Sequence, residues 1–167
     1  EQETEKAKYL YSLFAETITE AQKINPNHPI TIVNGDIQYL DLMSKYAKDW
    51  NLLGVNAYRG KTFTDLWKDV KQGPDVPVIF FEFGSDAFNA KEFREDQRAQ
   101  ADYLRRQWID MYNNSYGRGY GNSIGGFVFE WRDEWWKYKQ TENLDSDTLD
   151  QVRELDEEIS RLLDPES

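Results

Sequence analysis

The chain has 167 residues, of which 39% are hydrophobic and 15% aromatic, and its 31 Asp+Glu outnumber its 20 Lys+Arg to give a net charge of -11. This length suits about one domain, and the apolar content is sufficient for a packed core, so we do not expect a disordered chain. The negative charge argues against nucleic acids and anionic membrane surfaces as partners, because both would repel it.

Several chemistries are excluded by the residues that the chain lacks. It has no cysteine, which excludes disulfides, thiol catalysis and cysteine-type zinc sites. Its single histidine, His28, lies in the turn NPNHP and is interpreted as a solvated loop residue. A histidine-based metal site and a Ser-His-Asp triad are therefore not expected, and we expect neither a metal nor a cofactor.

The sequence carries no visible targeting signal. No apolar run approaches the ~20 residues of a membrane span, and no signal peptide is visible. The chain opens on EQETEK without Met, which favours a processed or truncated protein. These features indicate no particular compartment.

The first part of the chain predicts a helix, a strand and a second helix. Over residues 4–23 the apolar side chains recur at steps of three and four, as in an amphipathic helix: Ala7, Leu10, Phe14, Ile18 and Ala21. The turn NPNHP ends this helix, because proline lacks an amide hydrogen and disfavours helix in the residue before it. The β-branched run 30–33 predicts the first strand. The next helix is predicted from Leu40, Met43, Ala47 and Trp50.

The same alternation continues to the end of the chain. Residues 52–55 and 78–82 predict the second and third strands, with a short helix between them on Phe63, Leu66, Trp67 and Val70. A long helix is predicted over residues 91–111 from the alignment of Phe93, Gln97, Ala101, Leu104, Trp108 and Met111. The glycine-rich loop YGRGYGNS leads to the fourth strand at 124–131. The tail predicts an amphipathic helix on Leu149, Val152, Leu155, Ile159 and Leu162.

Strands separated by helices predict an α/β fold with a parallel sheet, because parallel neighbours need a crossover connection. The predicted strands are apolar on both faces, as in strands covered by helices or closed into a barrel. No Gly-x-Gly-x-x-Gly follows a strand and no P-loop pattern occurs. We expect half of a (β/α)8 barrel, with four βα units and a leading helix in residues 1–143 and a capping helix in residues 144–167.

Polar or aromatic residues end each predicted strand: Asn34 and Asp36, then Asn56 and Tyr58, then Glu82, and last Glu130 and Trp131. The carboxyl ends of strands in (β/α) architectures face the active site, so Glu82 holds a rigid, partly desolvated position suited to a catalytic carboxylate. Retaining glycosidases use two carboxyl groups about 5–5.5 Å apart. Carbohydrate is the expected ligand, with aromatic faces for sugar rings from Tyr58 and Trp131 and hydrogen bonds to hydroxyls from Asn34, Asp36 and Asn56.

Four segments, NPNHPITIVNGD, LLGVNAYRGKTF, VPVIFFEFGSDAFN and GNSIGGFVFEWRDEWWK, resemble the last four βα units of a clan A glycoside hydrolase barrel. The resemblance is to the barrel domains of family 2-like glycoside hydrolases and, more distantly, to fungal-type β-glucanosyltransferases. It covers roughly residues 25–143. Its most specific feature is the succession of Asn-x-Tyr, Glu-Phe-Gly and Gly-Gly-Phe-x-Phe. The resemblance implies that Glu82 is the nucleophile, that Tyr58 supports it and that Trp131 floors the sugar subsite.

The chain departs from the family pattern in the missing first half of the barrel. The family's acid/base glutamate belongs to an Asn-Glu pair at the end of the fourth barrel strand, and neither that pair nor the first four strands is found in this sequence. We therefore expect the chain to be inactive alone and to need a complementary half. The clean helical spacing and dense charge pairing of the tail favour an engineered half-barrel or a fragment with a helical cap.

Several candidate site residues also have a structural interpretation, and for Trp131 it is core packing between the last strand and the flanking helices. Glu82 could form a buried ion pair instead, Asp36 could cap a helix, and Tyr58 could be a rim aromatic rather than a hydrogen-bond donor to Glu82. Alternation along the last strand would turn Glu130 away from the mouth of the barrel if Trp131 points into it.

The residues leave two functions open. A free half-barrel exposes two sheet edges and an apolar inner face, and such surfaces pair with something. The first hypothesis is half of a retaining β-glycosidase, hydrolase or transglycosylase, that acts with its complementary half. The second is a non-catalytic module, engineered or degenerate, that self-associates or binds glycans weakly. We expect the first helix and the tail helix to help cover the open sheet.

Overall fold

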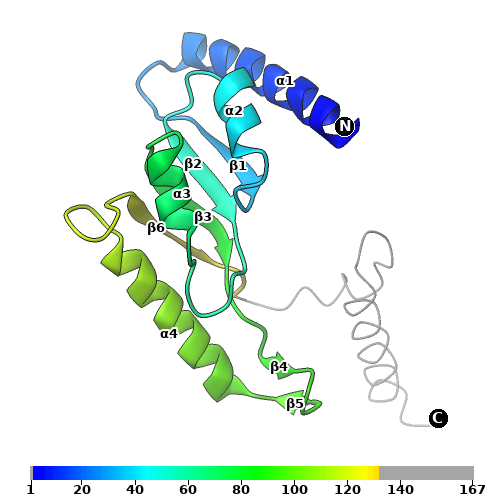
Figure 1. The fold of residues 1–167 in the computed structure, drawn as a ribbon, viewed down its shortest axis with the longest axis vertical. Helices are drawn as coiled ribbons and strands as arrows, with labels where there is room; N and C mark the ends of the chain where they lie inside the picture. The colour runs from blue at the N-terminus through cyan, green and yellow to red at the C-terminus, as the bar shows by residue number, and fades with distance from the viewer. Residues whose placement is uncertain (1, 132–167) are drawn as a thin grey trace.

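The computed structural model describes residues 2–131, so the helix predicted in the tail lies outside the described residues. The elements shown in Figure 1 are α1 (Gln2–Ile24), β1 (Thr31–Gly35), α2 (Leu40–Tyr46), β2 (Leu52–Asn56), α3 (Leu66–Gln72), β3 (Val78–Phe83), β4 (Phe88–Asn89), β5 (Arg94–Glu95), α4 (Gln97–Asn113) and β6 (Ser123–Val128). Within residues 2–131, no helix is long and apolar enough to cross a membrane.

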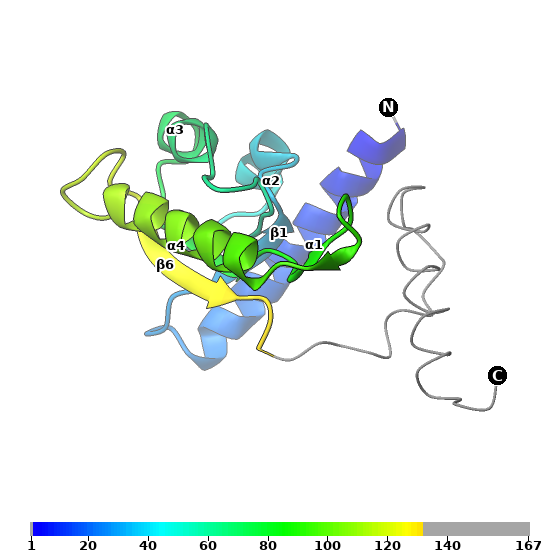
Figure 2. The ribbon, with the colours of Figure 1, turned by 90° about the horizontal axis from the view of Figure 1, so that it is seen from below.

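The main sheet has four strands in the order β1-β2-β3-β6, and all neighbouring strands are parallel. This confirms the predicted α/β class and the predicted parallel pairing. The carboxyl ends of the four strands therefore lie at one edge of the sheet, which we call the carboxyl edge. Helices α2, α3 and α4 lie on one side of the sheet (Figures 1 and 2).

The face of the sheet beneath these helices forms the core. Phe80 and Phe83 of β3 are fully buried there with Phe63 and Trp67 from the segment after β2. The rings of Phe63 and Phe80 lie 4.0 Å apart, and those of Trp67 and Phe80 lie 5.5 Å apart in an edge-to-face arrangement. Burying one such side chain is worth about 1.5–3 kcal/mol, and each aromatic pair adds about 0.5–1.5 kcal/mol.

A glycine in β6 permits the close approach of this strand to β3. A Cβ atom on Gly126 would lie 2.5 Å from the Cβ of Phe80. Because real Cβ atoms do not approach that closely, any larger residue here would push β6 away from the aromatic core.

The opposite face of the sheet, which we call the open face, is exposed within the described residues. Val33, Phe81 and Phe127 retain 42%, 37% and 60% of their accessible surface, although all three lie within strands. The rings of Phe81 and Phe127 contact each other across β3 and β6 at 6.1 Å. Strand alternation explains the contrast between Phe80, which is buried, and its neighbour Phe81.

The prediction for the fourth helix was wrong at its start. We expected a helix from residue 91, but α4 begins at Gln97, after the β4–β5 hairpin. Asn89 accepts hydrogen bonds from the amides of Lys91 and Glu92 and forms a turn, and Phe93 has a φ of 48°, which no helix contains. Asp96 then caps α4 by accepting from the amide of Ala99 at 2.9 Å.

The buried stripe of the first helix also differs from the prediction. Ala7 and Ile18 are buried as expected, but Leu10 is half-exposed and Tyr11 takes its place in the core. The hydroxyl of Tyr11 donates to Oδ1 of Asn34 at 3.0 Å and so ties α1 to β1. A tyrosine can bury its ring while its hydroxyl finds a polar partner, which an apolar periodicity does not reveal.

Candidate active site

Tyr58 and Glu82 meet at the carboxyl edge of the sheet. Glu82 is the last residue but one of β3, and Tyr58 follows the end of β2. The Tyr58 hydroxyl donates to Oε2 of Glu82 at 3.0 Å. The amide of Ala57 donates to the carbonyl oxygen of Glu82 at 3.0 Å and continues the strand pairing to this point. The hydrogen bond expected from the sequence is therefore present, while the catalytic roles of both residues stay predictions.

The surroundings of Tyr58 are acidic. Burial raises the pKa of the Tyr58 phenol, the hydrogen bond to Glu82 raises it further, and the charges of Glu82, Asp86 and Glu130 add to the effect. Carboxylates from β3, from the loop after β3 and from the segment after β6 thus gather near one hydroxyl. The outward orientation expected for Glu130 rests on strand alternation and stays a prediction. Regular pairing of β6 ends at Val128, so strand alternation does not extend to Glu130.

We expect the stabilising effect of Tyr58 to decline at high pH. The folded state favours the neutral phenol, so the folded pKa lies above the ordinary value of about 10. The contribution of Tyr58 to the free energy of unfolding is therefore complete below about pH 10 and is lost as the pH rises toward the folded pKa. The measurement is the difference in unfolding free energy between wild type and Tyr58→Phe, from urea denaturation at pH values between about 7 and 11. A difference that does not shrink above about pH 10 would contradict the raised pKa.

Asp36 forms an ion pair that the sequence did not reveal. Both of its carboxylate oxygens accept from Arg59, at 2.8 Å from Nε and 2.6 Å from Nη2. Nη1 of Arg59 also donates to Asp65, Thr64 and the carbonyl oxygen of Phe63. Arg59 thus closes the loop after β2 onto the end of β1. The only sequence signal was an arginine directly after Tyr58.

The two candidate asparagines differ in their availability. Oδ1 of Asn34 accepts from Tyr11, and its Nδ2 donates to the carbonyl oxygen of Gln38 at 2.5 Å, so the side chain is engaged in structure. Asn56 lies opposite Glu82 in the register of β2 and β3. Its Oδ1 is buried and has no hydrogen-bond partner among residues 2–131. Asn56 is therefore the asparagine that retains an unused polar atom beside Glu82.

Asp36 is engaged in the structure, whereas Trp131 is exposed. The Asp36 carboxylate is only partly exposed and is held by Arg59 and by the amide of Ile37. It does not cap α2, whose N-terminal cap is Tyr39. Trp131 is fully exposed at the end of the described residues. The structure thus brings Tyr58, Glu82 and Asn56 together, while Asn34 and Asp36 serve the packing of β1.

Gln107 of α4 links the two loops that follow Tyr58 and Glu82. Its Nε2 donates to the carbonyl oxygens of Gly60 at 2.7 Å and Gly84 at 3.0 Å. Each glycine lies two residues beyond one member of the pair. The Gln107 side chain is completely buried. Sequence reasoning missed this residue, because a glutamine on a predicted helix gives no sign of its distant partners.

Replacing Gln107 by methionine is expected to loosen the Tyr58–Glu82 hydrogen bond. The change keeps the shape of the side chain but leaves the Gly60 and Gly84 carbonyl groups without their donor, which costs about 1–3 kcal/mol of stability. The pKa of Tyr58, followed by NMR with ring-labelled tyrosine, should move toward its ordinary value. Gln97→Met on the exposed surface of α4 is the control and should change neither quantity. A destabilised Gln107→Met protein with an unchanged Tyr58 pKa would contradict this role.

The described residues contain no group of three or more His, Cys, Asp or Glu side chains arranged to hold a metal ion. The reactive group at the carboxyl edge is the half-buried carboxylate of Glu82, with the neutral phenol of Tyr58 as its hydrogen-bond donor. Comparison with protein-family models and with curated proteins finds no match to this chain.

Proposed function

We propose that the chain is the nucleophile-bearing half of a retaining β-glycosidase barrel that acts together with a complementary half. The hydrogen bond between Tyr58 and Glu82 at the carboxyl edge carries this proposal. A carboxylate nucleophile in such a site must be held in one orientation, and a neutral phenol can do so without a competing negative charge.

The open face supports the half-barrel part of the proposal. Phe81 and Phe127 would become buried if further strands completed the cylinder, because alternate side chains of a (β/α)8 barrel fill its interior. The sheet also has unpaired edges at β1 and β6 among the described residues. Association with a partner would pair these strand edges and bury this apolar face.

The proposed reaction follows from these positions. A Glu82 oxygen attacks the anomeric carbon as the bond from that carbon to the leaving-group oxygen breaks, and the Tyr58 hydroxyl steadies the other oxygen of Glu82. The complementary half supplies the acid that protonates the leaving group, and the same group then removes a proton from the water that releases the sugar. General acid catalysis contributes about 10²–10⁴-fold, so the isolated chain is proposed to be inactive.

Mixing this chain with a chain that carries the first four barrel strands tests the proposal. We expect a complex of equal parts in analytical ultracentrifugation and hydrolysis of an aryl β-glycoside by that complex. A complex without hydrolysis above the buffer rate would count against catalysis.

The second candidate is a non-catalytic half-barrel that assembles with a copy of itself. The exposed rings of Phe81 and Phe127 fit this candidate as well as the first, because they would be buried in either assembly. A homodimer of the isolated chain that does not exchange with the complementary half would support this candidate.

A further inference from the structure

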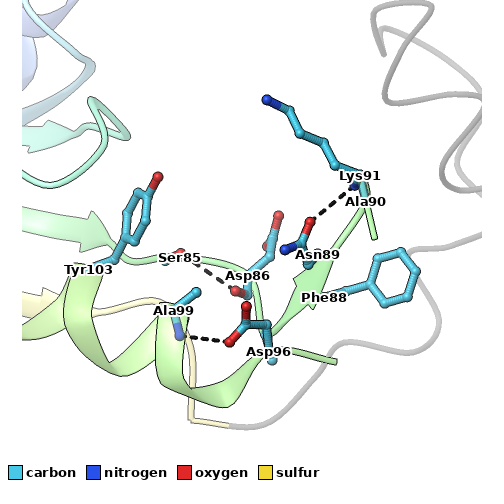
Figure 3. A pocket seen from close by; sticks show the side chains of 10 residues that line it. Ser85, Asp86, Phe88, Asn89, Ala90, Lys91, Asp96, Ala99 and Tyr103 are labelled. Atoms are coloured by element: carbon cyan, nitrogen blue, oxygen red, sulfur yellow. Dashed lines mark hydrogen bonds between the residues drawn. The ribbon is translucent and has the colours of Figure 1, made fainter. Parts of the chain in front are cut away.

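A cavity of about 410 Å³ lies beside the candidate active site, in the loop between β3 and α4. This volume falls within the range of about 300–1,000 Å³ that is usual for small-molecule sites. Its lining includes Ser85, Asp86, Phe88, Asn89, Lys91 and Tyr103. The β4–β5 hairpin and the first turns of α4 hold these residues in place (Figure 3).

The walls of the cavity are fixed by the hydrogen bonds that shape the loop. Asn89 accepts from the amides of Lys91 and Glu92, and Asp96 accepts from the amide of Ala99. The backbone hydrogen bond from the amide of Asp96 to the carbonyl oxygen of Ala87, at 2.7 Å, joins the two ends of the hairpin. The cavity is therefore built on the chain's own backbone pairing.

Other polar groups in the cavity are left unused. The Asp86 carboxylate, the Lys91 ammonium and the Tyr103 hydroxyl make no hydrogen bond to another side chain or backbone group among residues 2–131. Figure 3 shows these three side chains on the same side of the loop. The Tyr103 ring is held by the ammonium of Lys61, which lies 5.0 Å from its centroid and forms an ion pair with Asp102.

The cavity is lined by the segment that follows Glu82 in the chain. Asp86 lies four positions after Glu82 in the chain, and its charge acts on the Tyr58 hydroxyl. Ser85 and Asp86 are therefore the lining residues that follow Glu82 most closely in the chain.

We propose that this cavity binds a neutral hexopyranose unit of an oligosaccharide whose neighbouring unit lies at Glu82. A carboxylate accepts hydrogen bonds from adjacent sugar hydroxyls, an ammonium and a phenol donate to others, and aromatic carbon packs on the apolar parts of the ring. The proposal rests on the proposed function, because the position of Glu82 defines which sugar is the neighbour.

The charge around the cavity selects against acidic sugars. Asp86 and Asp96 line it against a single lining cation, Lys91, within the described residues. The hydrogen bond from the amide of Ala99 lowers the pKa of Asp96 further below neutral. The charges of Glu82 and Glu130 act on Tyr58, so a uronate in a ligand that extends to Glu82 would be repelled there as well.

The test is a titration of the full chain with neutral β-linked gluco-, manno- and galacto-oligosaccharides, followed by saturation-transfer NMR and calorimetry. Oligogalacturonate serves as the acidic counterpart. We expect at least one neutral oligosaccharide to bind and the uronate not to bind. Asp86→Ala should weaken binding at least about tenfold, because a hydrogen bond to a charged group is worth about 1.5–3 kcal/mol. Tyr103→Phe should weaken it less, and Asp41→Ala on the exposed surface of α2 should have no effect.

Binding that persists unchanged in both cavity variants, tighter binding of the uronate, or no binding of any neutral oligosaccharide would overturn the proposal. Should Asp86→Ala lower the melting temperature, Tyr103→Phe and Lys91→Met decide the question. The outcome is separable from that of the proposed function. One possible outcome is that Glu82→Gln still binds the oligosaccharide and that the reconstituted wild-type chain does not hydrolyse glycosides. This outcome would support the cavity as a sugar-binding site and contradict the proposed glycosidase activity. Hydrolysis of aryl glycosides without oligosaccharide binding would do the reverse.

Discussion

Replacing Glu82 by glutamine is expected to reduce aryl β-glycoside hydrolysis by the reconstituted barrel at least about 10³-fold, because the nucleophile that forms the covalent intermediate is lost. The amide keeps an oxygen that can accept from Tyr58, so the change removes reactivity with little change in shape. The measurement is the initial rate with an aryl β-glycoside at saturating concentrations of both halves.

The stability of the isolated chain provides a second readout of the same variant. Glu82→Gln should leave the unfolding free energy unchanged or slightly higher, because it removes one of the negative charges gathered near Tyr58. Glu16→Gln on the exposed surface of α1 is the control and should retain full activity. A reconstituted Glu82→Gln barrel with wild-type rates would show that Glu82 is not the nucleophile.

Replacing Phe80 by alanine should destabilise the isolated chain by about 3–5 kcal/mol, the usual cost of deleting a large side chain from a packed core. Phe80 is completely buried and contacts the rings of Phe63, Trp67 and Phe83. Urea denaturation measured by tryptophan fluorescence would report the loss. The effect is large relative to the usual total stability of a domain, which is about 5–15 kcal/mol.

Phe81→Ala is the matched control, because it changes the next residue of the same strand. Phe81 lies on the open face, so its removal should cost the isolated chain less than about 1 kcal/mol. It should weaken association with the complementary half instead, because the exposed ring would be buried there. Equal destabilisation of the isolated chain by both variants would mean that the open face is covered in solution.

Much of the candidate site depends on side chains that reach across the fold. Arg59 joins the loop after β2 to the end of β1, and Gln107 joins the same loop to the end of β3. Tyr58 lies in that loop, directly before the two linked residues Arg59 and Gly60. The loop that carries Tyr58 is therefore restrained by both an ion pair and a buried amide.

The amino-acid sequence by itself determined the class of the fold and the edge at which its polar residues gather. The short β-branched and aromatic runs separated by helical periodicities predicted β1, β2 and β3 and their parallel pairing. The positions of Tyr58 and Glu82, each at or just after the end of a strand, predicted that they would meet. These features are readable because they follow from the spacing of neighbouring residues and from the rule that parallel strands end at one edge.

Only the tertiary structure decided which polar side chains at that edge are available and which are engaged. Asp36 is engaged by Arg59 and Asn34 by Tyr11, through partners 23 residues away in the chain. Gln107 lies 47 residues from Gly60, and no local pattern indicates such a contact. Likewise, the start of α4 at Gln97 depends on a turn formed by Asn89 and a cap formed by Asp96, which override the apolar spacing of the segment. Hydrogen bonds between residues distant in the chain depend on how the elements pack in three dimensions. The spacing of residues along the sequence therefore does not predict them.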